Sequence, residues 1–321
     1  MNSLFKIHFL NFFFYGYKNT GDLFCSPLLY FNDFFGKYNV ILHQIQSPRF
    51  FEISKNDVVI IGGGGVLYDN WNANINKIIQ ICDNVIIWGA GTNSSDINAY
   101  ENHEVKIDYT KFRLVGVRDF RNNFNLRYTP CVSCMLPLIQ EAKSIKSTER
   151  IGSMLSFGYN CSPKYENLDH FHNINEVFDF ISKHEIIITS SYHCSYWATL
   201  CGKKVIGLSD GSTPKIINQK YAPQIITSSV FQNENELEKI IEKSIVHTDA
   251  LGDCISETYR FFLEVKNIVE SLATKKFDNY SYFYDRMAVA SIATRFDSYN
   301  SRIEHLEKKL SEIEKNSKGK Q

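Results

Sequence analysis

Residues 186–208, IIITSSYHCSYWATLCGKKVIGL, constrain the fold of this chain more than any other stretch. A β-branched segment leads through two serines into apolar residues at helical spacing, and a second β-branched segment follows Gly202. This order predicts a strand, a helix that ends at Gly202, and a further strand of a parallel sheet. Because ligands bind at the carboxyl ends of such strands, Ser190, Ser191 and His193 are candidate site residues.

His193 is the strongest single candidate for chemistry. A histidine beside hydroxyl groups at a strand end can titrate near neutral pH and act as a general acid or base. The alternative is a histidine of the core that only makes hydrogen bonds. Its position at the end of a strand favours the functional interpretation.

The length and charge of the chain narrow the class of protein. Its 321 residues suit two domains of ordinary size better than one large domain. Lys and Arg number 35, as do Asp and Glu, so no overall charge directs the chain to nucleic acid. The apolar N-terminus is interrupted by Lys6, His8 and Asn11, and no run reaches the roughly 18 apolar residues of a spanning helix. We therefore expect a cytoplasmic protein.

Strands that end in glycine or polar turns characterise the first half of the chain. Segments 57–61, 84–88 and 113–117 have the composition of buried strands. The turns that follow them can bring bare backbone N–H groups or a guanidinium to an anion, or can serve only close packing. For Arg118, a pair with Asp119 is the alternative. The candidates in these turns are Gly63, Gly64, Gly91, Asn93 and Arg118.

The remaining pattern predicts a second sheet and a division into domains. A polar stretch at 141–150 separates the halves, which we place at residues 1–145 and 146–275. The helix at 255–272 either closes the second domain or crosses back to the first. The other predicted elements are strands at 5–10, 151–157 and 224–227, a helix at 23–35 that begins after Asp22, and helices at 75–82 and 234–245, the latter capped by Asn233.

A third segment, 276–321, has a different pattern. Its apolar residues recur at alternating spacings of three and four, which is typical of a coiled coil or a docking helix. We expect a homo-oligomer through this seam. The seam consists of Val289, Ile292, Phe296, Tyr299, Ile303, Leu306, Leu310 and Ile313.

The eight cysteines and the histidines outside the site do not predict a metal centre. Several cysteines lie in apolar segments and fit small buried hydrophobes. Cys131 and Cys134 form a lone CxxC, which is too little for a structural zinc site and lacks a thioredoxin-like context. His170 and His172 have no third ligand at a matching spacing. We expect no metal.

Six stretches taken together resemble the polysaccharide pyruvyl transferase family, at residues 19–31, 58–67, 85–93, 114–119, 129–137 and 188–206. The resemblance implies a GT-B-like fold with two Rossmann-like domains that face each other across a cleft. It implies transfer of a pyruvyl group from phosphoenolpyruvate to a sugar of a surface polysaccharide, as a ketal, without a cofactor or metal. We expect the acceptor on the first domain and the donor on the second.

The resemblance also assigns roles to residues. The catalytic histidine of the family corresponds to His193, and its strand-end arginine to Arg118; we add Asp22 to the substrate-binding candidates. Well-studied members carry a second arginine where this chain has Ser191, so a GT-B glycosyltransferase that uses a nucleotide-activated sugar stays open. Arg118, Arg121 and Lys215 are the cations that could compensate, but nothing in the sequence places them near the site. A scaffolding subunit is a third hypothesis. The expected partner is a sugar or lipid-linked acceptor, and contact with the inner face of the membrane stays open.

Overall fold

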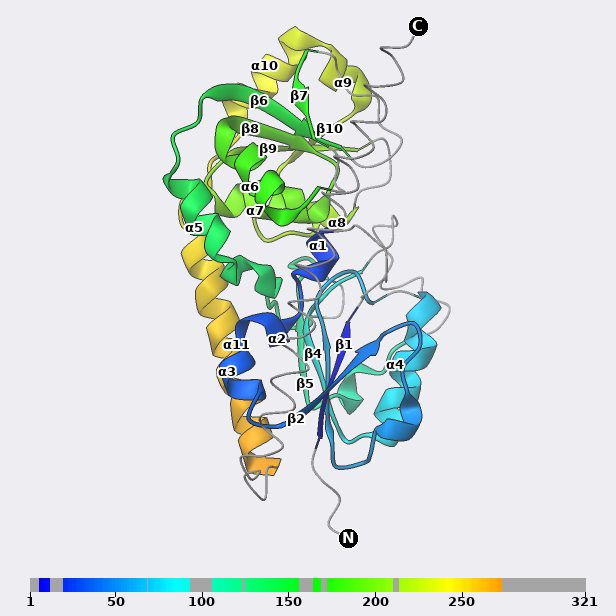
Figure 1. Ribbon diagram of the computed structural model, residues 1–321. Coiled ribbons are helices and arrows are strands. Elements are labelled where there is room, and N and C mark those ends of the chain that lie inside the picture. Colours follow the sequence, from blue (N-terminus) through cyan, green and yellow to red (C-terminus); the bar gives the residue numbers. More distant parts are fainter. Residues whose placement is uncertain are drawn as a thin grey trace, which may run out of the picture.

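The computed structural model describes residues 6–11, 20–67, 69–92, 106–122, 125–155, 164–168, 172–209 and 214–272. These residues form an α/β fold with two parallel five-stranded sheets and helices against their faces (Figure 1). Asn93 and the predicted seam at 289–313 lie outside the described residues. No helix in the described ranges combines the length and the apolar character needed to span a membrane.

The first sheet has the strand order β2-β1-β3-β4-β5. Alternate residues of its strands pack against helices on opposite faces, which explains why the strands read as continuous apolar runs. Ile61 and Ile87 lie on the face that packs against α4. Ile60 and Trp88 lie on the opposite face, which packs against α3. The bounds are β1 (Lys6–Asn11), β2 (Asn39–Gln44), β3 (Val58–Gly62), β4 (Asn84–Ala90), β5 (Leu114–Val117), α3 (Asn32–Phe35) and α4 (Asp69–Ile81).

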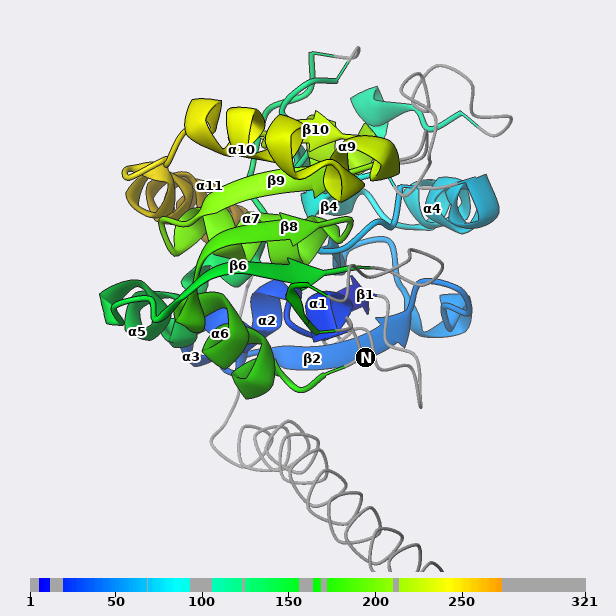
Figure 2. The same ribbon diagram turned by 90° about the horizontal axis from the view of Figure 1, so that it is seen from above.

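The second sheet has the order β10-β9-β8-β6-β7. If the strands of each sheet are numbered in the order in which they occur along the chain, both sheets have the same strand order, 2-1-3-4-5. In both sheets the order reverses beside the first strand, between β1 and β3 and between β6 and β8, and ligands of such folds bind at this point. Figure 2 shows β9, β8 and β6 side by side. The strands are β6 (Glu149–Met154), β7 (Glu166–Asn167), β8 (His184–Thr189), β9 (Lys204–Leu208) and β10 (Gln224–Ile226).

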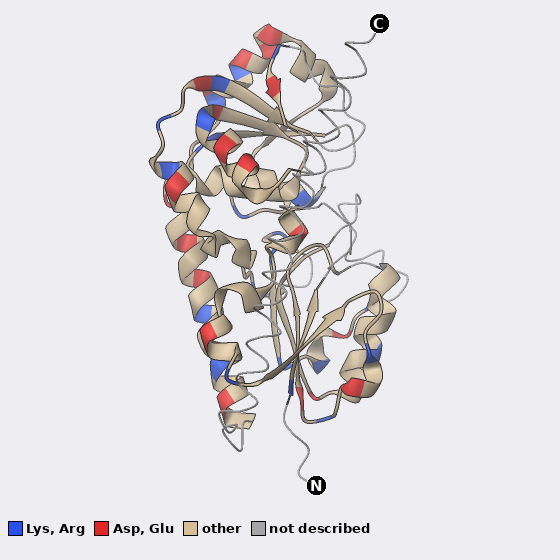
Figure 3. Ribbon diagram, viewed as in Figure 1, with Lys and Arg blue, Asp and Glu red and all other residues tan. Residues whose placement is uncertain are grey.

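Helices cover both faces of the second sheet as well. Ile187 and Val205 face one group of helices, α5, α6 and α7, whereas Ile188 and Ile206 face α9 and α10. Charged residues gather on helices and near strand starts (Figure 3). The bounds are α5 (Pro137–Ser144), α6 (Ile174–Lys183), α7 (Tyr192–Leu200), α8 (Pro214–Ile217), α9 (Ser228–Gln232) and α10 (Glu234–Lys243).

The long helix α11 (Ala250–Leu272) joins the two layers. Its first turns, with Leu251 and Cys254, belong to the core beneath the second sheet. Farther along, Phe261 and Val265 pack against the first sheet, and α11 runs down one side of the molecule in Figure 1. The sequence left open whether this helix closes the second domain or crosses back to the first, and the structure shows that it crosses back.

Most predicted elements are confirmed with small shifts at their ends, but the helix at 23–35 is wrong. The chain forms three short helices there, α1 (Thr20–Leu23), α2 (Pro27–Tyr30) and α3. Pro27 lacks an N–H and forces Ser26 into an extended conformation, which interrupts the helix. Asp22 consequently lies inside α1 rather than at an N-cap. The structure also contains elements that the sequence did not predict: β2, β7, α5, α6, and the short helices α8, α9, η1 (Phe50–Glu52), η2 (Tyr109–Lys111) and η3 (Val132–Met135).

A buried chain of hydrogen bonds connects β2, β1 and Asp57, the residue before β3. His43 Nδ1 accepts from the backbone N–H of Arg49 at 3.3 Å, so a neutral His43 carries its proton on Nε2. His43 Nε2 lies 2.8 Å from His8 Nδ1, and His8 Nε2 lies 3.1 Å from Asp57 Oδ2. The contacts thus lead from His43 through His8 to the carboxylate of Asp57. Burial, followed by the charges of His8 and Arg49, lowers the pKa of His43 to about 4.

We predict that the free energy of unfolding falls between pH 6.5 and pH 4 because of His43. Its pKa of about 4 in the folded chain lies below the ordinary 6.5, so the unfolded chain binds the extra proton first. The loss is up to ~3 kcal/mol. Urea unfolding at pH 7.5 and pH 4.5 measures it. His43→Gln keeps a donor for His8 without titrating, and should lose less stability over this range; an equal loss in both proteins contradicts the assignment.

Candidate functional site

The turn after β8 places His193 at the edge of the second sheet that faces the first. Ser191 precedes α7, and its backbone N–H donates to Thr189 Oγ1 at 3.0 Å, which fixes the turn. Ser190 is buried, Ser191 is half-buried, and His193 in the first turn of α7 is 7% exposed. The short helix α1 lies between the two sheets (Figure 1). The predicted strand, turn and helix therefore deliver the histidine to the region between the layers.

Helix α1 packs its backbone directly on the imidazole of His193. A Cβ atom added at Gly21 would overlap Nδ1, Cγ and Cβ of His193, so only glycine permits this approach. The contact joins residues 172 positions apart in sequence. Gly21 is a site residue that the sequence prediction missed, although it precedes the candidate Asp22.

Arg118 is a buried cation with unused donors. It follows β5 directly and is 2% exposed. Its guanidinium carbon lies 3.8 Å from the centre of the Tyr192 ring, a cation–π contact. Within the described part of the chain, Nε and Nη1 have no hydrogen-bond partner. Asp119 is buried too and accepts from the backbone N–H of Thr92 at 2.8 Å, so Arg118 is not part of a surface pair.

The glycines that follow the strands make room for the protein's own groups. A Cβ at Gly91 would lie 2.6 Å from Arg118 Nε, so the absent side chain gives the guanidinium its place. Gly63 and Gly64 have φ values of +74° and +71°, which favour glycine. A Cβ at Gly63 would overlap the backbone of Cys25, and one at Gly64 would lie 3.1 Å from Asp22 Oδ1. Substrate contact at these glycines stays a prediction.

Electrostatic interactions place Lys215 with the predicted residues. Burial lowers the pKa of His193, and the charges of Arg118 and Lys215 lower it further. Burial raises the pKa of Asp22, against the opposing effect of Arg118 and then Lys215. Burial also lowers the pKa of Lys215, as does Arg118, while Asp22 opposes the shift. Two cations, one carboxyl group and one imidazole are therefore close enough to shift one another's pKa values. Nothing in the sequence placed Lys215 beside the other three.

The two cysteines of the CxxC have different partners. Cys131 Sγ lies 3.8 Å from His193 Nε2, whereas Cys134 Sγ lies 3.3 Å from Thr258 Oγ1 on α11. Burial raises the pKa of both thiols. Across the described ranges, no three His, Cys, Asp or Glu side chains are arranged to hold a metal ion.

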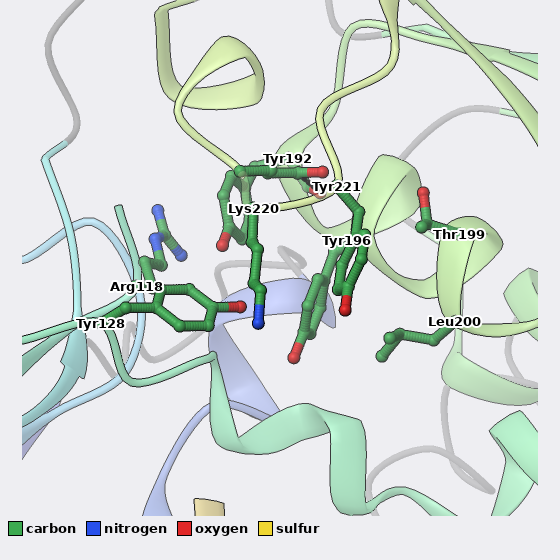
Figure 4. A pocket seen from close by; sticks show the side chains of 9 residues that line it. Arg118, Tyr128, Tyr192, Tyr196, Thr199, Leu200, Lys220 and Tyr221 are labelled. Carbon is green, nitrogen blue, oxygen red and sulfur yellow. Dashed lines mark hydrogen bonds between the residues drawn. The ribbon is translucent and has the colours of Figure 1, made fainter. Parts of the chain in front are cut away.

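A small cavity lies behind the Arg118 side chain (Figure 4). Its volume of about 10 Å³ suits one water molecule rather than a substrate. Lys220, one of its lining residues, is bound through Nζ to Asp253 Oδ2 at 2.6 Å. Its charge is thus already balanced. The cavity is also lined by Tyr128, Tyr192, Tyr196 and Tyr221, of which Tyr192 contacts the Arg118 guanidinium.

Comparison with solved structures finds a functionally uncharacterized protein from Klebsiella pneumoniae subsp. pneumoniae. It is 18% identical, with a TM-score of 0.41, and the alignment covers 70% of this chain and 92% of that chain. The search of curated proteins gives no match.

The comparison with protein families agrees with the motifs. The family model described as Polysaccharide pyruvyl transferase matches residues 2–212. This range includes Gly21, Asp22, Arg118 and His193, and it ends just before Lys215. It covers well over half of the chain and confirms the predicted resemblance. The chain therefore belongs to the polysaccharide pyruvyl transferase family, a family of transferases.

Proposed function

We propose that this chain transfers a pyruvyl group from phosphoenolpyruvate to a sugar of a surface polysaccharide, as a ketal, and releases phosphate. Family membership supports the reaction class. The observation that carries the donor assignment is the buried Arg118 guanidinium, two of whose nitrogens have no hydrogen-bond partner in the described residues. A buried cation with free donors is stabilised by an anion, and phosphoenolpyruvate offers a carboxylate and a phosphate.

The donor is proposed to lie between two cations from different sheets. Arg118 follows the last strand of the first sheet, and Lys215 on α8 follows β9 of the second. Lys215 supplies a positive charge in a chain that has Ser191 where well-studied members carry arginine. A lysine is a point charge without the fixed fork of arginine, so it suits a phosphate better than a bidentate carboxylate contact.

His193 is proposed as the acid and base of the transfer. Burial keeps its imidazole neutral near pH 7, since the pKa is lowered. A neutral imidazole can accept the proton of a sugar hydroxyl, and the resulting imidazolium can protonate the vinyl carbon. The proton then moves from oxygen to carbon as the first bond between a sugar oxygen and the donor carbon forms. A second hydroxyl of the same sugar then displaces the phosphate from that carbon, which completes the ketal, and its proton leaves with the phosphate.

We further propose where the substrates bind, which cofactors are absent, and how and where the chain assembles. The two sheets are proposed to act as GT-B-like domains, residues 1–145 on the acceptor side and 146–275 on the donor side, with a sugar or lipid-linked acceptor between them. We propose that neither a metal nor a cofactor takes part. Residues 276–321 are proposed to form an oligomer through their seam, in the cytoplasm or at the inner face of the membrane.

The first prediction of this proposal concerns donor binding. Arg118→Lys keeps the charge but loses the forked donor pair, so the dissociation constant for phosphoenolpyruvate should rise about tenfold or more. Isothermal titration calorimetry measures it. Arg113→Lys is the matched control, because Arg113 is exposed at the opposite end of the same strand.

The same titration discriminates the glycosyltransferase alternative. The panel contains phosphoenolpyruvate and CMP-, UDP-, GDP- and dTDP-linked sugars. Binding of phosphoenolpyruvate that Arg118→Lys weakens supports pyruvyl transfer. Binding of a nucleotide sugar alone contradicts it and makes the chain a glycosyltransferase.

A second prediction tests the cation on α8. Lys215→Gln removes a charge that acts on the pocket, so KM for phosphoenolpyruvate should rise about tenfold with a smaller change in kcat. Initial-rate kinetics at varied donor concentration measure both constants. Lys204→Gln is the control, since Lys204 begins β9 and its Nζ donates to Ile241 O at 3.0 Å, away from the site. Equal effects of the two variants would rule out a specific role of Lys215.

A third prediction concerns proton transfer. His193→Gln should lower kcat by about 10²–10⁴-fold while donor binding persists. In the unsubstituted chain the neutral imidazole is the active form, and its pKa is lowered by burial, Arg118 and Lys215. Activity should therefore fall on the acid side only below the ordinary histidine pKa of about 6.5. A pH–rate profile checks this, and full turnover by His193→Gln would remove His193 from the mechanism.

A further inference from the structure

The CxxC stretch, residues 131–134, is bound to one face of α7 by three side-chain contacts. His193, Tyr196 and Trp197 are spaced at i, i+3 and i+4, so they lie on the same side of the helix. Tyr196 OH donates to Cys131 O at 3.0 Å, and Trp197 Nε1 donates to Ser133 Oγ at 3.0 Å. The third contact is the 3.8 Å approach of Cys131 Sγ to His193 Nε2. The imidazole and the thiol are therefore held together from two sides.

The donor and acceptor in each of these hydrogen bonds follow from the chemistry of the side chains involved. The indole N–H of Trp197 can only donate, so it occupies an acceptor site of Ser133 Oγ. Ser133 then has its own proton available for Cys131 Sγ, 3.2 Å away. Burial raises the pKa of Cys131 and lowers that of His193, so a neutral thiol faces a neutral imidazole. An imidazole nitrogen is a stronger acceptor than a thiol sulfur, and the S–H donates to Nε2.

The other ring nitrogen faces a different element. Nδ1 lies against the backbone of α1 at Gly21, on the side away from Cys131. The charged groups that act on the ring are Arg118 after β5 and Lys215 on α8, and both oppose a positive charge on it. The ring therefore stays neutral, and the thiol at Nε2 decides which nitrogen carries the single proton.

We propose that Cys131 is a positioning residue that holds the His193 imidazole in one orientation and in the tautomer with its proton on Nδ1. The single lone pair of the ring is then on Nε2, so in the proposed transfer the sugar hydroxyl replaces the S–H at this nitrogen, while Nδ1–H faces the backbone of α1. This explains the first cysteine of the CxxC without a metal or a disulfide. The second, Cys134, packs on Thr258 of α11 and takes no part.

The test is the tautomer of His193, read from imidazole ¹⁵N–¹H correlation spectra of the full chain labelled at histidine. The difference spectrum against His193→Gln assigns the signals. We expect one neutral tautomer with Nδ1 protonated, kept in Cys131→Ser, which retains a donor, and replaced by a mixture of tautomers in Cys131→Ala. Cys134→Ala is the control for loss of a buried thiol and should match the unsubstituted chain. If Cys131→Ala does not fold, Cys131→Val fills the volume and gives the same reading.

A proton on Nε2 in the unsubstituted chain, or unchanged signals in Cys131→Ala, would overturn the proposal. A kinetic readout, which rests on the transferase function proposed above, adds that kcat falls about tenfold in Cys131→Ala and recovers in Cys131→Ser, with donor KM unchanged. The two readouts fail separately. An inactive unsubstituted chain with the expected tautomer would contradict the transferase function and support the role of Cys131.

Discussion

The burial of the Arg118 guanidinium is the constraint on which the site depends. A cation that is 2% exposed is unfavourable unless neighbouring groups hold it, and the structure provides the Tyr192 ring at 3.8 Å, the space at Gly91 and the nearby Asp119. None of these neighbours gives Nε or Nη1 a hydrogen-bond partner in the described residues. Packing therefore does not explain these two donors, and they are the observation from which we propose the anionic donor.

Two sheets of the same strand order bring this cation to the histidine. Each sheet by itself places its polar residues at the carboxyl ends of its strands, beside the point where the order reverses. The long helix α11 packs against both sheets. Leu251 lies in the core beneath the second sheet, and Phe261 lies in the core of the first sheet. The contact of Gly21 with His193 is possible because the layers are held this way. A site formed by residues of both halves then needs no flexible side chain to reach across.

The sequence predicted the strands and the turns well, because buried parallel strands are continuous apolar runs that end in glycine or polar residues. It failed where a single residue overrides the pattern, as Pro27 does in the helix at 23–35, and where edge strands carry little apolar signal, as in β7. The helix α6 was missed although its capping box, Asn173 with Glu176, is visible in the sequence. His193 and Arg118 could be selected as strand-end residues. Gly21 was not selected. Cys131 and Lys215 were considered, but they could not be placed beside His193, because only packing between distant segments brings these residues together.

The position of Ser191 shows how the charge of the site differs from that of well-studied family members. An arginine at this position, just before α7, would place a second forked cation two residues from His193 and lower the pKa of the imidazole. Here the second cation comes from Lys215, beyond the stretch that matches the family model, and it acts on both His193 and Asp22. In the proposed site a lysine would thus replace an arginine, a point charge in place of a fork. Selectivity for the proposed anion would then depend on the forked guanidinium of Arg118, which acts on His193.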